Sequence, residues 1–475
     1  MRIIFASGEG NPYIKSGGLA DVVGALPKEL AKKGHECIVV LPKYMDLKMP
    51  ETLEYVTNFD IWVGWRKCYC GVFKSEYDGV TYYFVDNEQY FKRPGLYGYD
   101  DDNERFAFYD FAVLELISHL DIKPDILSLH DWQAAMIATL YKERYCYYDY
   151  YQGIKVTFTI HNIAYQGKCD PALLSDLFGL DNYLYYNGNT RNDGCLNFMK
   201  AAIYYSDAIT TVSPTYAKEI LTPANGEGLQ SILQMRRHDL YGILNGIDYD
   251  TNNPATDPNI VENFDVTNWQ EKKVINKTEL QKEVGLPVDP NIPLIGVVTR
   301  LTWQKGLDLI LNRLEEMTNR NLQLVILGSG DKEYEEPLKG IAAYHGDKIS
   351  LNLKYDFLLS CRIYAGCDLF LMPSLFEPCG LSQMMSMRYG TLPIVRETGG
   401  LKDSVEPFNE YENTGTGFSF ANYNAHEMMD TIDYALKVYS NKEQWNGLVE
   451  RAMTTVLDWD KSADAYLKVF NSVLD

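Results

Sequence analysis

The chain has 475 residues, 46% of them hydrophobic, which is more than one hydrophobic core usually serves and predicts two domains. Its 65 acidic residues against 44 Lys and Arg leave a formal charge of −21, which repels nucleic acid and anionic membranes and argues against both as partners. No stretch approaches the roughly 20 apolar residues of a membrane span, and the apolar start is interrupted by glycine too early for a signal peptide. Nine scattered cysteines without zinc-ligand spacing predict reduced thiols and a cytoplasmic location.

The first half of the chain alternates short apolar runs with helical segments. A helix is predicted over residues 21–33, with lysines in its last turn and Gly34 as its stop. Such alternation predicts a parallel sheet with right-handed crossovers. The expected strands cover residues 3–6, 37–41, 125–129, 156–160 and 208–212.

The same pattern restarts after about residue 245, which predicts a second doubly wound α/β domain. We assign residues 1–240 to the first domain, residues 241–455 to the second, and residues 456–475 to a separate terminal helix. Ligands are expected beyond the carboxyl ends of the strands, in a cleft between the domains. The second domain's expected strands cover residues 293–299, 322–327, 368–372 and 392–395, and one of its helices has an apolar face formed by Leu307, Ile310, Leu311, Leu314 and Met317. The terminal helix has an apolar stripe formed by Ala465, Tyr466, Val469, Phe470, Val473 and Leu474.

Three glycine-rich turns follow predicted strands and open helices, at residues 15–21, 300–306 and 398–401. Glycine lets backbone N–H groups approach a phosphate, and a helix N-terminus favours anions. Lys15, Arg300 and Lys305 lie on these turns. A cation before a helix opposes the helix dipole, so we expect a compensating anion, which a bound diphosphate would supply. Taken singly, each turn is a weak signal, and an ordinary strand-to-helix connection is the favoured interpretation.

A fourth turn, residues 376–382, places Glu377 before a proline and a helix start. The carboxylate either balances the helix dipole or lies against a transferred sugar, and both interpretations stay open. Cys379 lies in the same turn. Without a histidine base nearby in the sequence, a structural thiol is favoured over a nucleophile.

Two further groups of polar residues follow predicted strands of the first half. His161 and Asn162 come after residues 156–160, and Asp131 comes after the strand at residues 125–129. Their positions place them at the same edge of a parallel sheet. A lone histidine is more often structural than catalytic, so the position alone does not assign His161 a role.

Six segments together resemble those of the bacterial glycogen synthases and plant starch synthases, over nearly the whole chain. Their order and spacing make the resemblance highly specific. They are residues 15–22 (KSGGLADV), 161–167 (HNIAYQG), 211–214 (TVSP), 244–248 (LNGID), 300–306 (RLTWQKG) and 377–381 (EPCGL).

The resemblance implies a GT-B fold, in which two Rossmann-like domains face a cleft. The two domains are expected to close on the donor, and the terminal helix is expected to cross back to the first domain. It implies a retaining glucosyltransferase that moves glucose from ADP-glucose to the non-reducing end of an α-1,4-glucan, either glycogen or a maltooligosaccharide, and releases ADP. UDP-glucose as donor, another sugar or acceptor, and a non-catalytic glucan-binding relative are the alternatives.

The resemblance also implies roles for individual residues. Arg300 and Lys305 would neutralise the departing diphosphate, His161 would contact the glucose, and Glu377 would stabilise positive charge at the sugar ring. The residues expected to bind the donor are Lys15, Gly18, Asp21, Tyr355, Leu381 and Ser382. The sugar or acceptor candidates are Glu9, Asp131, Asn162 and Asn245, whereas Gly246 is assigned no role.

No metal and no cofactor are expected, because two cations and helix N-termini can do the electrostatic work of a magnesium ion at the diphosphate. The acidic run at residues 100–102 is interpreted as solvated surface. The sequence also departs from the family pattern at a few positions, none of which is assigned to catalysis. These are Gly10-Asn11 for valine-alanine, Thr251-Asn252 for valine-tryptophan, Phe357 for glutamate, Leu375 for arginine, and Met385 where some relatives have a second glutamate.

Overall fold

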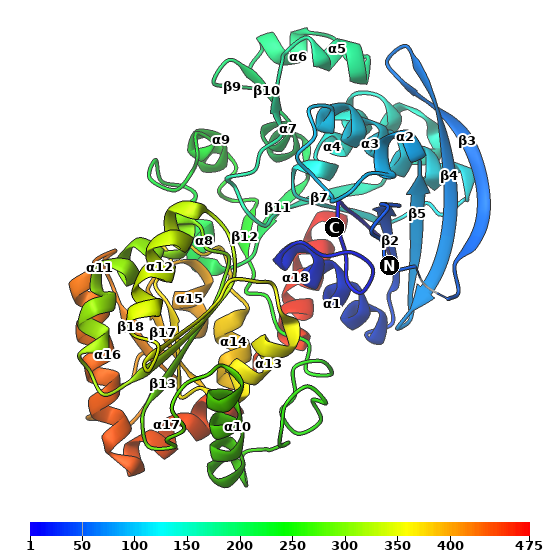
Figure 1. The fold of residues 1–475 in the computed structure, drawn as a ribbon. Helices are drawn as coiled ribbons and strands as arrows, with labels where there is room; N and C mark the ends of the chain where they lie inside the picture. The colour runs from blue at the N-terminus through cyan, green and yellow to red at the C-terminus, as the bar shows by residue number, and fades with distance from the viewer. Residues whose placement is uncertain (50) are drawn as a thin grey trace. The chain divides into compact units, whose positions relative to one another are not determined.

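The computed structural model describes residues 1–49 and 51–475. They form two compact units (Figure 1): unit 1 combines residues 1–245 with residues 459–475, and unit 2 spans residues 246–458. Each unit contains its own large sheet, connected through helices, so the predicted pair of α/β domains is confirmed. In the described part of the chain, no helix has the length and apolar character needed to cross a membrane.

The main sheet of unit 1 has nine strands among the described residues, in the order β12-β11-β7-β6-β1-β2-β5-β4-β3. The strands from β12 to β5 pair in parallel, and every strand predicted for this half is present. The strands are β1 (Arg2–Ser7), β2 (Glu36–Pro42), β3 (Glu54–Val63), β4 (Arg66–Tyr77), β5 (Val80–Asp86), β6 (Ile126–His130), β7 (Lys155–Ile160), β11 (Ala208–Thr211) and β12 (Leu240–Gly242). A small second sheet contains β8 (Lys168–Cys169), β9 (Arg191–Asn192) and β10 (Cys195–Asn197).

One edge of this sheet is antiparallel, which the expectation of a parallel sheet did not include. β4 pairs antiparallel with both β5 and β3. Asp78 and Gly79 join β4 to β5 with φ angles of 49° and 79°, the left-handed conformation that tight hairpin turns require. A two-residue turn leaves no room for the crossover that parallel pairing needs. The Asp-Gly pair was the available sequence signal for this hairpin.

A glycine sets the end of the first helix of unit 1, as the sequence predicts. Helix α1 closes at Gly34, whose φ of 87° lets the N–H of His35 donate to Leu30 O at 3.1 Å. Helix α18 belongs to this unit and packs on α1, with Tyr466, Val469 and Phe470 buried. The helices are α1 (Gly18–Lys32), α2 (Glu88–Phe91), α3 (Asp102–His119), α4 (Met136–Glu143), α5 (Leu173–Phe178), α6 (Tyr183–Tyr186), α7 (Phe198–Tyr205), α8 (Pro214–Glu219), α9 (Gln230–Met235) and α18 (Trp459–Leu474).

The sheet of unit 2 has six parallel strands among the described residues, in the order β15-β14-β13-β16-β17-β18. The four strands predicted for this half are confirmed, and β15 and β18 extend the two edges. The strands are β13 (Leu294–Val298), β14 (Gln323–Leu327), β15 (Ile349–Asn352), β16 (Leu369–Met372), β17 (Leu392–Arg396) and β18 (Phe418–Phe420). The helices are α10 (Trp269–Glu283), α11 (Leu307–Thr318), α12 (Lys332–Tyr344), α13 (Phe357–Gly366), α14 (Ser382–Arg388), α15 (Gly399–Ser404), α16 (Ala425–Ser440) and α17 (Lys442–Thr454).

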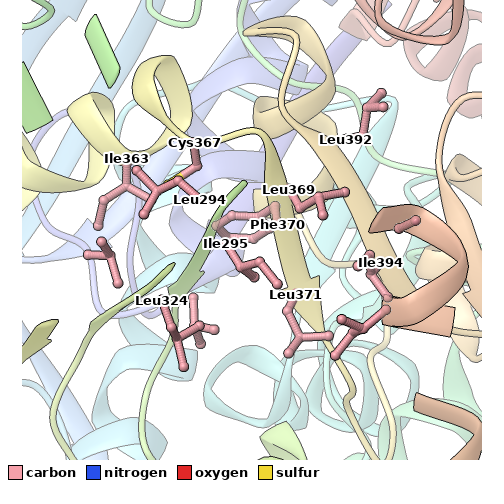
Figure 2. Packing of buried hydrophobic residues seen from close by; sticks show 14 of the residues in the cluster. Leu294, Ile295, Leu324, Ile363, Cys367, Leu369, Phe370, Leu371, Leu392 and Ile394 are labelled. Atoms are coloured by element: carbon pink, nitrogen blue, oxygen red, sulfur yellow. The ribbon is translucent and has the colours of Figure 1, made fainter. Parts of the chain in front are cut away.

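The core of unit 2 lies where the central strands meet helix α13. Figure 2 shows apolar side chains of β13 and β16 together with those of α13. At Gly296 of β13, an added Cβ would lie 2.6 Å from Ile363 and 3.0 Å from the Cys367 sulfur. Glycine in this strand therefore permits the close approach of α13.

The acidic run at residues 100–102 is more than solvated surface, contrary to expectation. Asp101 forms two hydrogen bonds with Arg93, at 2.6 and 2.8 Å, and Asp102 pairs at 2.5 Å with Arg105, which is fully buried. The Arg93 guanidinium holds the pKa of Asp101 below its ordinary value. Two of the three carboxylates therefore help to order the start of α3.

Asp110 is a fully buried carboxyl group in α3. Neither of its oxygens has a hydrogen-bond partner among the described residues. Burial raises its pKa well above the ordinary value, and the nearby backbone N–H of Met136 offsets only part of this effect. The folded chain therefore keeps the proton under conditions in which the unfolded chain loses it.

Replacing Asp110 by asparagine should stabilise the fold at neutral pH and have less effect near pH 4. Because the folded-state pKa is raised, the parent chain loses stability as pH rises above the unfolded pKa of about 4, by about 1.4 kcal/mol per pH unit until the folded pKa is reached. Thermal unfolding of both proteins across this range should show a Tm difference that grows with pH. A difference independent of pH would show that Asp110 is ionised in the folded chain.

Candidate active site

Glu377 and Lys305 form an ion pair at the carboxyl ends of the neighbouring strands β16 and β13. Lys305 Nζ lies 2.6 Å from Glu377 Oε2, and Ser374 Oγ donates to the same oxygen at 3.1 Å. The side chain of Lys305 is only 16% exposed, and that of Glu377 is only 8% exposed. Weak solvent screening makes their attraction stronger than that of a surface pair. The carboxylate is thereby held in one orientation.

Glycines let two neighbouring turns approach the loop that carries Glu377. An added Cβ at Gly306 would lie 2.1 Å from Pro373 O, and one at Gly399 would lie 1.9 Å from Glu377 O. Both glycines also have positive φ angles, 72° and 44°. The N–H of Gly400 donates to Glu377 O at 3.2 Å. Glycine at these positions is therefore required by packing around Glu377.

The glycines of the first turn have no such packing requirement. An added Cβ at Gly17 or Gly18 would meet no heavy atom within 4 Å among the described residues. Gly17 is extended, with φ −160°, and Gly18 begins α1. The described contacts explain the glycines of the other two turns but not these.

The other predicted donor residues of unit 2 lie along the same edge of its sheet. Arg300 is exposed after β13, and Tyr355 is 85% exposed after β15. Leu381 and Ser382 stand at the start of α14. Within the described residues, no hydrogen bond or ion pair joins Arg300 or Tyr355 to the Lys305–Glu377 pair.

His161 is hydrogen-bonded to a second buried histidine in unit 1. His130 Nδ1 lies 2.9 Å from His161 Nε2, and His130 Nε2 lies 3.1 Å from Ser128 Oγ. Burial lowers the pKa of His130 to about 3. Burial and the neighbouring His130 lower the pKa of His161 well below its ordinary value. Both rings are therefore neutral near pH 7, and one donates to the other.

Asp131 holds the backbone that carries His161. Its Oδ1 accepts the N–H of His161 at 2.7 Å and that of Asn162 at 3.5 Å. Asp131 has a φ of 54°, which side-chain-bearing residues rarely adopt. Burial raises the pKa of Asp131 to about 7, against the opposing effect of the two N–H groups. This carboxyl group therefore titrates near neutral pH.

Two acidic side chains, Glu9 and Asp21, hold the first turn. Glu9 accepts hydrogen bonds from the backbone N–H of Ser16 and from Ser16 Oγ, the latter at 3.0 Å. Burial raises the pKa of Glu9, and the contacts with Ser16 oppose that rise. Asp21 Oδ1 accepts from Lys15 Nζ at 2.7 Å and from Asn11 Nδ2 at 2.6 Å. Glu9 and Lys15 therefore lie in an ordered loop after β1, and Asp21 in the first turn of α1 holds the end of that loop.

The segment after His161 is fixed by residues from other elements. The hydroxyl oxygen of Tyr216 in α8 accepts the N–H of Ile163 at 3.1 Å. Gln166 Nε2 donates to Ile163 O at 2.9 Å, and Asn197 Nδ2 donates to Gln166 Oε1 at 2.7 Å. These contacts give Gln166 a structural role in the segment at residues 161–167.

Comparison with known proteins assigns both units. The starch synthase catalytic domain family matches residues 2–235, and the glycosyl transferases group 1 family matches residues 276–447. A glycogen synthase of Clostridium botulinum (strain Alaska E43 / Type E3) is 52% identical over 100% of this chain and 99% of that protein. The chain belongs to the glycogen and starch synthase family.

Solved structures agree with this family assignment. The catalytic domain of Starch Synthase IV from Arabidopsis thaliana, bound to ADP and acarbose, matches with a TM-score of 0.92 and 36% identity, covering 100% of this chain and 99% of that one. A sucrose-phosphate synthase from Thermosynechococcus elongatus matches with a TM-score of 0.64 and 14% identity, which supports the fold alone. The predicted GT-B architecture of this synthase-family chain is confirmed.

Two of the basic residues on the glycine-rich turns form ion pairs within the chain. This corrects the expectation that a bound anion must compensate a cation placed before a helix. Lys15 is compensated by Asp21 at 2.7 Å and Lys305 by Glu377 at 2.6 Å. A bound diphosphate is therefore not required to explain these two cations. No ion pair of Arg300 occurs within the described residues.

Three supporting residues had no role assigned from the sequence, although His130 was noted beside Asp131 at a strand end. Ser16, Ser374 and His130 hold Glu9, Glu377 and His161, respectively. Ser374 lies three residues before Glu377, and His130 directly precedes Asp131, so proximity to a motif was the only available signal.

Two departures from the family pattern, Asn11 and Asn252, form side-chain hydrogen bonds. Asn11 binds Asp21, and Asn252 Nδ2 donates to Asp248 O at 2.9 Å. Phe357 begins α13 and is 52% exposed. Met385 packs against the core of unit 2.

The contacts in the structure do not test two predictions, the role of Asn245 and the absence of a metal. Asn245 is 4% exposed, and its Oδ1 has no hydrogen-bond partner in the part of the chain that the structure describes. Among the described residues, no group of three or more His, Cys, Asp or Glu side chains is placed to hold a metal ion. The expectation that no metal is needed stays a prediction.

The titration of Asp131 should appear in the pH dependence of synthase activity. Above about pH 7 the ionised carboxylate is the stronger acceptor for the His161 N–H, so kcat/KM should fall as pH drops through that value. Asp131→Asn should remove this inflection. An unchanged inflection near pH 7 in the variant would assign it to another group.

Proposed function

We propose that this chain is a glycogen synthase that transfers glucose from ADP-glucose to the non-reducing end of an α-1,4-glucan, with retention of configuration and release of ADP. The largely buried Lys305–Glu377 pair carries the proposal at the level of chemistry, because it joins a cation suited to a diphosphate with a carboxylate suited to a cationic sugar. The glucan is glycogen or a maltooligosaccharide. The nine free thiols of the protein suit a cytoplasmic location.

On the donor side, Arg300 and Lys305 neutralise the diphosphate as it departs. An ammonium group has three donors, so Lys305 can keep Glu377 while it also binds phosphate oxygens. Backbone N–H groups of Gly18, Leu381 and Ser382 supply further donors, Lys15 adds a cation, and Tyr355 stacks on the nucleoside. This assignment replaces a metal ion with fixed protein charges.

On the sugar side, His161 is a neutral hydrogen-bonding group. Its ring contacts His130, and burial keeps both rings uncharged. A neutral ring can bind a glucose hydroxyl without adding positive charge beside the cationic transition state. Glu9, Asp131, Asn162 and Asn245 are the proposed contacts to sugar or acceptor hydroxyls.

The proposed reaction proceeds by attack on the same face that the diphosphate leaves. The acceptor hydroxyl forms the new bond to the anomeric carbon as the bond to the diphosphate oxygen breaks, and the departing phosphate takes the hydroxyl proton. Glu377 stabilises the positive charge that develops at the ring, without forming a bond to it. The product then keeps the α configuration of the donor.

A donor screen tests this function. ADP-, UDP- and GDP-glucose are each incubated with a maltooligosaccharide, and chain length and released nucleotide are measured. Elongation should be fastest with ADP-glucose, and NMR of the product should show a new α-1,4 linkage. Absence of transfer from every donor, or a β linkage, would refute the proposal.

The role assigned to Gly18 gives a sharper test of the donor site. Gly18→Ala should leave Tm unchanged or slightly raised, because its added Cβ meets nothing within 4 Å among the described residues. KM for ADP-glucose should rise, since the methyl group hinders the approach of a phosphate to the backbone N–H. Gly399→Ala is the contrasting control and should destabilise the fold. An unchanged KM in the first variant would remove Gly18 from the donor site.

A further inference from the structure

Arg396 contacts the backbone of the loop that carries Glu377. It ends β17, and its Nε donates to Ser374 O at 2.7 Å. Its Nη2 donates to Leu375 O, the next carbonyl along the chain. The planar guanidinium thus engages two successive peptide groups just before Glu377, which a lysine ammonium with its single nitrogen does not reproduce.

The contacts of Arg396 lead to Glu377 through Ser374. Ser374 is 1% exposed, and its Oγ donates to Glu377 Oε2 at 3.1 Å. A guanidinium that fixes the Ser374 carbonyl therefore also fixes the residue from which this hydroxyl projects. Lys305 approaches the same carboxylate oxygen, so a shift of the loop would disturb both contacts.

Other elements hold the same loop, but among the described residues no other hydrogen bond reaches the Ser374 carbonyl. The N–H of Leu375 donates to Gln304 O at 2.9 Å, and Gln304 Nε2 donates to Phe376 O at 3.2 Å. The Arg396 guanidinium is itself located by Tyr423, whose ring centre lies 5.9 Å from it. The loop is therefore fixed from two sides, and Arg396 supplies one of them.

We infer that Arg396 is a positioning residue for Glu377, holding the loop so that the carboxylate keeps its place against the transferred sugar. The inference rests on the proposed role of Glu377 in glucosyl transfer. Arg396 acts through the backbone of residues 374 and 375. It therefore affects the rate of the chemical step more than the binding of the donor.

The test compares Arg396→Met and Arg396→Lys with the parent enzyme and with Arg451→Met. Arg451 is a matched control, because its Nε also donates to a backbone carbonyl of unit 2, Gly415 O, at 2.9 Å. Arg396→Met should lower kcat about 10- to 100-fold, as a small misplacement of a catalytic group does, while KM for ADP-glucose changes less than about twofold. Arg396→Lys should recover part of the lost kcat, and Arg451→Met should retain full kcat.

The same substitution in a Glu377→Gln background separates this inference from the proposed function. If Arg396 acts through Glu377, Arg396→Met should cost little further kcat once Glu377 has been replaced. An equal fold-loss in both backgrounds, or a raised KM with unchanged kcat, would overturn the inference. If Arg396→Met does not fold, the lysine variant supplies the same comparison. Full activity of Glu377→Gln alone would instead refute the role proposed for Glu377.

Discussion

Replacing Lys305 by methionine should lower kcat about 100- to 1,000-fold, the range found when one preorganised charge-stabilising group is removed from an active site. The ammonium group lies 2.6 Å from Glu377 and is the proposed counter-charge for the departing diphosphate. Methionine keeps the length and apolar stem of the side chain but supplies no charge. Steady-state rates with ADP-glucose and a maltooligosaccharide measure the loss.

The loss of kcat in Lys305→Met should be the same at every magnesium concentration, because in the proposed reaction protein cations, and not a magnesium ion, neutralise the diphosphate. Lys348→Met is the matched control: this lysine lies in the same unit and donates to the carbonyls of Thr318 and Arg320 at 2.9 and 2.7 Å. Its replacement should leave kcat unchanged. If a chelator abolished the activity of the parent enzyme and magnesium restored it, the account of the leaving group would be wrong.

Glu377→Gln should also lower kcat about 100- to 1,000-fold, because the amide is isosteric but cannot offset positive charge at the sugar ring. It should also reduce stability by about 1–3 kcal/mol, since Lys305 is left mostly buried without its carboxylate. Steady-state rates measure the loss of kcat, and thermal unfolding of the same preparation measures the loss of stability.

A double variant distinguishes a catalytic carboxylate from a structural one. Combining Glu377→Gln with Lys305→Met removes both charges, so much of the lost stability should return. Activity should stay as low as in the single variants. Recovery of activity together with stability would mean that Glu377 serves only to balance Lys305.

Local patterns in the sequence were sufficient for the secondary structure and for the family. Buried strands of four to seven residues show as continuous apolar runs, and Gly34 predicted the end of α1. The motifs at residues 15–22, 161–167, 300–306 and 377–381 are contiguous, so their resemblance to the family needed no contact information. The hairpin between β4 and β5 was missed although Asp78-Gly79 signals it, because the alternation of strands and helices favoured parallel pairing.

The partners of the charged and titratable groups came from the tertiary structure. Lys305 and Glu377 are 72 residues apart, and His130 and His161 are 31 residues apart, so no local pattern pairs them. The pKa of Asp131, about 7, depends on burial and on N–H groups from another strand end. Desolvation and hydrogen bonding act over a few ångströms in space, and only the fold decides which residues lie within that distance.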